Sequence, residues 1–206
     1  MTTRLLGILG LIDAILATLL LQILLRQTVF PGQKGVVLVW CLPIAFGLHV
    51  FEEFAFPRGL GEWSKDHRPQ IADSMTTAHF YRINAIGGAA TLGVALGAFD
   101  YARGYSFMGI RAWLAVLAWV AFNALVHIRG TIESRRYSPG TVTSVALYLP
   151  LAVGATAYFL RQGAVDVVSL AIGAVWGVAA YAFFIRRLRK RAATETGEAR
   201  SSTGRE

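Results

Sequence analysis

Residues 5–25 read LLGILGLIDAILATLLLQILL, an apolar block in which Asp13 is the single ionisable residue. A secretory signal peptide has a shorter apolar core of about 7–15 residues and a cleavage site made of small residues. This block is longer and ends in Leu24, Leu25 and Arg26. A helix needs about 20 apolar residues to cross a bilayer. The stretch therefore predicts a retained membrane-spanning helix, and Asp13, near its centre, is expected to have a partner.

Five similar apolar blocks follow along the chain. Of its 206 residues, 55% are hydrophobic and 16% are charged, whereas soluble domains carry about a quarter charged residues. The sequence therefore predicts an all-α polytopic transmembrane bundle of about six spans. We expect one membrane domain over residues 1–190 and a disordered polar tail over residues 191–206. The five further blocks are residues 36–56, 79–99, 110–128, 141–160 and 165–185.

Basic residues dominate the charge, with a formal net charge of +8 and a pI of about 10.1. In a soluble protein this balance would indicate nucleic acid as a partner, but here the basic residues lie between the apolar blocks and after the last one. With six spans, 13 basic residues fall on one side and 5 on the other. The positive-inside rule then predicts a cell (inner) membrane protein with both termini in the cytoplasm. No nucleic acid is expected, and the cluster Arg186–Arg191 is expected to contact anionic lipid headgroups.

Polar side chains gather at one end of the predicted bundle. His49, Glu52 and Glu53 lie three and four residues apart, so they share a helix face at the end of the second block. Asn123 and His127 share a face of the fourth block in the same way. Because adjacent blocks run in opposite directions, these ends should lie at similar depth. Also at this depth are His79, Arg82, Asn84, Glu133 and Tyr137.

Imidazole and carboxylate groups inside apolar helices are costly and indicate a functional site. We expect the metal ligands to be His49, Glu52, Glu53, His79 and His127. Such ligands suit zinc, iron or manganese, and the lack of thiolates argues against copper(I) or an iron–sulfur cluster. The expected catalytic residues are Glu53 and Glu133, and the expected substrate-binding residues are Arg82, Asn84, Asn123 and Tyr137. Alternatively, the two adjacent glutamates are interfacial carboxylates that meet Arg58 or Arg82, and Asn123 with His127 joins neighbouring helices.

The segment HVFEE at residues 49–53 resembles the motif of the HXXEE family of bacterial and archaeal membrane proteins. The apolar lead-in from Trp40 and the aromatic residues and proline after Glu53 are similar to that family. A second block resembles the family in residue type and spacing and contains Asn123, His127, Thr131, Tyr137, Pro139, Gly140 and Thr143. The resemblance covers about residues 36–184. It implies a membrane protein with a site at these residues and does not imply a reaction.

Two functions from different classes fit these observations. The first is a metal-dependent membrane enzyme, a hydrolase or an oxidoreductase, that acts on a lipid-like or small apolar substrate. The second is a proton- or cation-coupled small transporter or ligand-binding membrane protein. A transporter should have polar groups on a path to the far side of the bundle, and the sequence has few there. Loss of metal on mutation of the cluster would separate the two functions.

Overall fold

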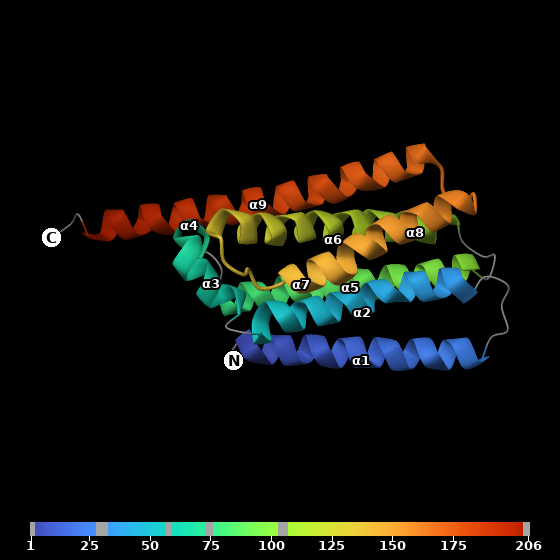
Figure 1. Ribbon diagram of the computed structural model, residues 1–206. Coiled ribbons are helices and arrows are strands. Elements are labelled where there is room, and N and C mark those ends of the chain that lie inside the picture. The colour runs from blue at the N-terminus through green and yellow to red at the C-terminus, as the bar shows by residue number, and fades with distance from the viewer. Residues whose placement is uncertain (1–2, 28–32, 57–58, 73–75, 103–106, 204–206) are drawn as a thin grey trace.

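The computed structural model describes residues 3–27, 33–56, 59–72, 76–102 and 107–203, and the rest of this section concerns these residues. They are mainly helical and contain no strand, so the all-α prediction is confirmed. The long helices lie side by side, and the start of α1 and the end of α9 lie at the same end of the bundle (Figure 1). The helices are α1 (Thr3–Gln27), α2 (Gln33–Ala55), α3 (Leu60–His67), α4 (Pro69–Ala72), α5 (Thr77–Ala102), α6 (Phe107–Ser134), α7 (Thr141–Thr143), η1 (Ser144–Tyr148), α8 (Leu149–Arg161) and α9 (Val167–Thr203).

Four helices in the described residues are long and apolar enough to cross a membrane. They are Thr3–Arg26, Lys34–Ala55, Gly109–Ser134 and Thr141–Arg161, and each corresponds to an apolar block of the sequence. The other two expected spans are also helical, but α5 is not among the four and the apolar part of α9, Val167–Phe183, is shorter. The polar residues at the start of α5, such as Arg82 and Asn84, lower its hydropathy. A count of six spans therefore remains a prediction.

The outward faces of the outer helices are apolar, as a hydrocarbon surrounding requires. On α1 and α9, isoleucine, leucine and valine side chains are exposed instead of packed inside. The interior is also mainly apolar and holds a few polar groups such as His49, Glu52 and His127. An apolar outer surface over an apolar core is compatible with a membrane protein. The exposed apolar side chains include Ile8, Ile12, Leu16, Leu19, Ile23, Val168, Ile172, Val175 and Trp176.

Helix α1 packs closely along α2. A Cβ at Gly47 would lie 2.5 Å from the carbonyl oxygen of Gly10, and a Cβ at Gly10 would lie 2.8 Å from the carbonyl oxygen of Gly47. The two backbones therefore touch at these glycines, which is how small residues join helices in membranes. Beyond α2, the bundle continues through α5 and α6 to α9, and α8 packs on α2 and α6.

The fifth apolar block forms one continuous helix, Thr141–Arg161, that contains a π turn, η1. Pro150 has no N–H for the carbonyl one turn earlier, and π turns accommodate such a break. The π turn includes Tyr148, whose ring lies 4.7 Å from that of His49, centroid to centroid. The irregular backbone thus lies beside the polar cluster.

Helix α9 continues to Thr203 and extends beyond the end of the bundle (Figure 1). The sequence predicts a disordered tail from residue 191, whereas the structure has this segment as helix up to Thr203. The boundary at residue 190 between a membrane domain and a tail remains a prediction.

Candidate metal centre

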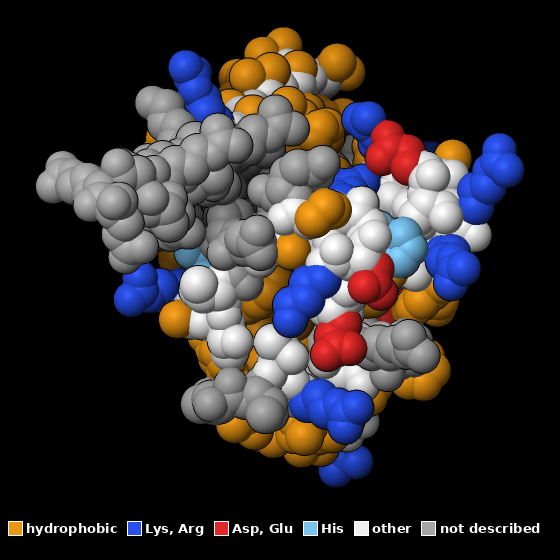
Figure 2. Space-filling view, turned by 90° about the vertical axis from the view of Figure 1, so that its left-hand side faces the viewer, with side chains coloured by type: hydrophobic (Ala, Val, Ile, Leu, Met, Phe, Trp, Pro, Cys, Tyr) orange, Lys and Arg blue, Asp and Glu red, His pale blue; other side chains and the backbone are white. Residues whose placement is uncertain are grey.

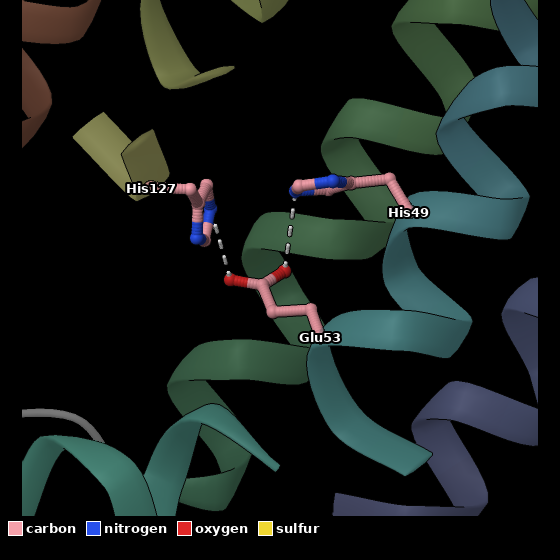
Figure 3. A group of neighbouring side chains, drawn as sticks. All are labelled: His49, Glu53 and His127. Carbon is pink, nitrogen blue, oxygen red and sulfur yellow. Dashed lines mark ion pairs between the residues drawn. The ribbon is translucent and has the colours of Figure 1, made fainter. Parts of the chain in front are cut away.

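Three of the expected ligands meet inside the bundle, as Figure 3 shows. His49 and Glu53 lie one turn apart on α2, and His127 reaches them from α6. The Nε2 atom of His49 lies 4.0 Å from Oε2 of Glu53, and Nε2 of His127 lies 3.8 Å from Oε1. The two imidazole rings are 4.9 Å apart, which confirms the prediction that the faces of these two helices share a site.

Hydrogen bonds fix the orientation of the His49 ring. Its Nδ1 lies 2.8 Å from the hydroxyl oxygen of Thr143, which donates its own proton to the carbonyl of Gly140. With the hydrogen of Nδ1 donated to Thr143, the lone pair is on Nε2. This Nε2 faces Glu53 and also lies 3.2 Å from the amide nitrogen of Asn123. The side chain is buried, with 2% of its surface exposed.

His127 is oriented in a similar way by the turn before α7. Its Nδ1 faces that turn, since a Cβ at Gly140 would lie only 2.9 Å from it. Its Nε2 is therefore the ring nitrogen that faces Glu53, at 3.8 Å from Oε1. Metal-bound histidines generally donate their second ring N–H to a nearby acceptor.

The Glu53 carboxylate is enclosed by these two imidazoles. Its side chain is 12% exposed, and within the described residues no hydrogen bond reaches it. The distances of 3.8 and 4.0 Å are too long for a hydrogen bond. Three electron-pair donors thus face one another, an arrangement that a cation bound between them, or a proton on the carboxyl group, makes favourable.

The ligand atoms of His49, Glu53 and His127 lie within 4.8 Å of one another, so this group can hold a metal ion. In tetrahedral zinc sites with bonds of about 2.0–2.1 Å, ligand atoms are roughly 3.4 Å apart. Side-chain shifts of about half an ångström would close the group around an ion. Two histidines and a carboxylate leave further coordination positions open.

Glu52, the neighbour of Glu53, has a different environment. Its Oε1 accepts hydrogen bonds from the Tyr137 hydroxyl and from the Val142 N–H at 2.8 Å. Its Oε2 accepts one from the Thr143 N–H at 2.7 Å. Glu52 therefore satisfies free N–H groups at the start of α7. Burial, followed by the hydrogen bond to Glu52, raises the pKa of Tyr137 well above its ordinary value, so this hydroxyl stays a donor at neutral pH.

The other expected site residues lie outside this group. His79 is half-buried near the start of α5 and supplies none of the grouped ligand atoms. Arg82 is exposed. Glu133 is exposed and paired with Arg129 and Arg68. Asn84 lies on α5, where its amide donates to the carbonyl of Phe80.

A cavity of about 160 Å³ lies beside the group. His49, Glu53 and His127 form part of its wall, together with Asn84 and Asn123. Most of the remaining wall is aromatic or aliphatic, from Phe46, Phe54, Leu60, Phe80, Ile83, Trp119 and Val126. The ligand group, which would leave coordination positions of a metal open, thus borders a small and mainly apolar cavity.

Sequence reasoning missed two residues of this wall, Trp63 and Arg68. They belong to the polar stretch after the second block, in which we predicted no site residue. One signal was present, because Leu60, Trp63 and Ser64 have the spacing of one helix face. That face of α3 borders the cavity.

The comparisons with known proteins identify a family for this chain but no activity. A family model described as a protein of unknown function with an HXXEE motif matches residues 40–155. The matched region contains all three grouped ligands, as well as Glu52 and Thr143, whereas α1 lies outside it. No curated protein and no solved structure matches the chain. Since the match covers more than half of the sequence, this chain belongs to the family of proteins with an HXXEE motif.

Proposed function

We propose that this protein is a metal-dependent membrane enzyme that acts on a lipid-like or small apolar substrate. One observation carries the proposal: two imidazole lone pairs and a carboxylate face one another at 3.8–4.0 Å with no hydrogen bond between them. A proton cannot bridge atoms at that distance. A divalent cation balances the carboxylate and binds both imidazoles, so the ligands are His49, Glu53 and His127.

The donor set supports zinc, iron or manganese as the ion. Two histidines and one carboxylate form catalytic zinc sites and also the facial triads of iron(II) oxygenases. Both leave positions open for water or substrate. A bound ion would supply Lewis acidity that polarises an oxygen of the substrate or of water.

The chain's own residues would hold these parts in place. Thr143 would hold the His49 ring in the tautomer that leaves Nε2 for the metal, and the turn at Gly140 lies against Nδ1 of His127. Asn123 lies 3.2 Å from Nε2 of His49 and borders the cavity, so its amide is placed to bind a polar atom of the substrate. The aromatic wall limits the entry of water. Glu133, Arg82 and His79 lie outside the ligand group, so we propose that they act only around the site and not as metal ligands.

The proposal includes the membrane setting. A lipid bilayer surrounds the apolar outer faces, and the end of the bundle that carries the site faces the cytoplasm, with both chain termini on that side of the inner membrane. Arg186 and Arg187 are exposed and would contact anionic headgroups. The side chains of residues 188–191 in the same cluster lie outside the described part. No nucleic acid partner is proposed.

The test is the metal content of detergent-purified protein, measured by mass spectrometry. Wild-type protein should contain about one zinc, iron or manganese ion per chain. Glu53→Gln and His127→Ala should each lose most of it, while Glu133→Gln, which changes an exposed carboxylate on α6, should retain it. Metal-free wild-type protein that is also unaffected by added ions would refute the enzyme proposal and favour the proton- or cation-coupled transporter or binding protein.

A further inference from the structure

One cationic side chain, Arg68, borders the cavity beside the ligand group. It follows α3, and its backbone N–H donates to the carbonyl of Ser64 at 2.7 Å while its own carbonyl accepts from Ala72 at 3.1 Å. These bonds hold Arg68 at the junction of α3 and α4. Its side chain is 28% exposed, so the guanidinium lies where the cavity meets the surface.

The charge of Arg68 is only partly balanced. Its Nη2 donates to Glu133 at 3.1 Å, but Glu133 also accepts from Nε of Arg129 at 2.6 Å. One carboxylate therefore serves two guanidinium groups. Arg68 carries five N–H donors, and the described residues provide one hydrogen bond to them, so it can still bind an oxyanion.

A second donor lies next to it. The Nε1 atom of Trp63 is buried and has no hydrogen-bond partner within the described residues. The Trp63 ring borders the cavity and lies under the Arg68 guanidinium at 5.8 Å. The ring beneath the guanidinium keeps the positive charge of Arg68 at the rim of the cavity.

The size of the cavity limits how large an apolar group can accompany the oxyanion in the ligand. An apolar cavity of about 150 Å³ is known to hold benzene, so 160 Å³ holds about six carbon atoms. The end of the bundle carries Lys and Arg side chains among acidic and hydrophobic ones (Figure 2). A ligand that spans both regions is an amphiphile with a charged head.

We propose that the cavity binds an amphiphile with an anionic head, a carboxylate or a phosphate, which Arg68 and Trp63 hold at the rim while the adjoining carbons enter the apolar space. This inference rests on the proposed function, because it names the substrate class of the same site. The head group lies beside the ligand group, so the reacting bond is close to the head and not at the far end of the chain.

Binding can be measured by quenching of tryptophan fluorescence with brominated ten-carbon probes in neutral detergent. The probes are a carboxylate, a phosphate monoester, an alcohol and a trimethylammonium ion of equal chain length. Chelator is present throughout, so that no probe binds through a metal. The carboxylate and the phosphate monoester should both bind more tightly than the alcohol, and the ammonium ion most weakly; the comparison of the first two identifies the source of the oxyanion.

Arg68→Gln should weaken the binding of both anionic probes roughly tenfold, which corresponds to the loss of one charge-assisted hydrogen bond. The substitution should leave the affinity for the alcohol unchanged, and this result would also show that the variant is folded. The matched control is Arg129→Gln, which removes the other guanidinium bound to Glu133 and does not border the cavity. Equal losses in the two variants, or binding of the alcohol as tight as that of the anions, would overturn the inference. Because the assay needs no metal, its outcome is independent of the metal measurement: Arg68-dependent binding, together with purified wild-type protein that neither contains nor takes up a metal, would refute only the proposed function.

Discussion

The carboxylate of Glu52 on α2 accepts the backbone N–H of Thr143 at 2.7 Å, which joins residues 91 positions apart in the chain. The same carboxylate accepts bonds from Tyr137 and Val142. Thr143 in turn orients His49. Glu52 therefore supports the ligand group indirectly, through the segment that holds the imidazole.

Replacement of Glu52 by glutamine should destabilise the protein. The amide has one acceptor oxygen and no charge, so it cannot accept all three hydrogen bonds. Bonds to charged groups contribute about 1.5–3 kcal/mol each, so we expect a loss of about 2 kcal/mol or more, measured by thermal unfolding in detergent. The metal content should stay close to that of wild type. A variant of normal stability without metal would instead make Glu52 a ligand.

Tyr137→Phe should cause a smaller loss of stability than Glu52→Gln. This loss should depend on pH only at alkaline pH. The pKa of Tyr137 is raised above its ordinary value of 10.0, first by burial and then by Glu52. A raised pKa means that the stabilisation is fully present below pH 10 and is lost as the pH rises above it. The difference in unfolding temperature between wild type and Tyr137→Phe should therefore be constant from pH 6 to about 9 and shrink above about 10. A difference that changes between pH 6 and 8 would contradict this assignment.

Gly140→Ala should disrupt the ligand group. Gly140 has φ +93°, and a Cβ there would lie 2.7 Å from Cε1 of His49 and 2.9 Å from Nδ1 of His127. Both imidazoles would have to move, so metal content and unfolding temperature should fall together. The control is Gly154→Ala, where a Cβ would meet nothing within 4 Å. That change in a helix should be neutral or stabilise by up to about 1 kcal/mol.

Asp13→Leu should stabilise the protein. Asp13 lies in the middle of α1 and borders a second cavity of about 330 Å³ with Tyr81 and Asn84. The sequence led us to expect a partner for it, yet within the described residues it has no hydrogen bond or ion pair. An ionisable residue at the centre of a span costs about 2.5–3.5 kcal/mol on insertion scales. A rise in unfolding temperature, larger than for Gln22→Leu, is expected; a fall would indicate a bound partner.

Local patterns account for what the sequence could predict. Block length is a property of neighbouring residues, so all six apolar blocks correspond to helices. The spacing of His49 and Glu53 places them on one face before any fold is known, and the same holds for Asn123 and His127. The meeting of these two faces followed from helix direction, since alternate helices end at the same side.

Contacts between distant segments explain the features that could not be predicted from the sequence. Glu52 and Glu53 are equally placed with respect to His49, and their difference arises only where Tyr137, Val142 and Thr143 fold onto α2. Arg68 lies in a polar connection, and the local signal there, the helix face shared by Leu60, Trp63 and Ser64, does not indicate that this face borders the cavity.

The division of the ligand group between α2 and α6 has a consequence for biosynthesis. When α2 has entered the bilayer, Glu53 and His49 are in place, but His127, Thr143 and the turn at Gly140 have not yet been translated. The site is thus a late product of assembly, completed only when the second half of the chain packs onto the first. Substitutions at His127 or Thr143 should therefore leave insertion intact and yield inserted chains that fail to mature, which cells would remove by proteolysis.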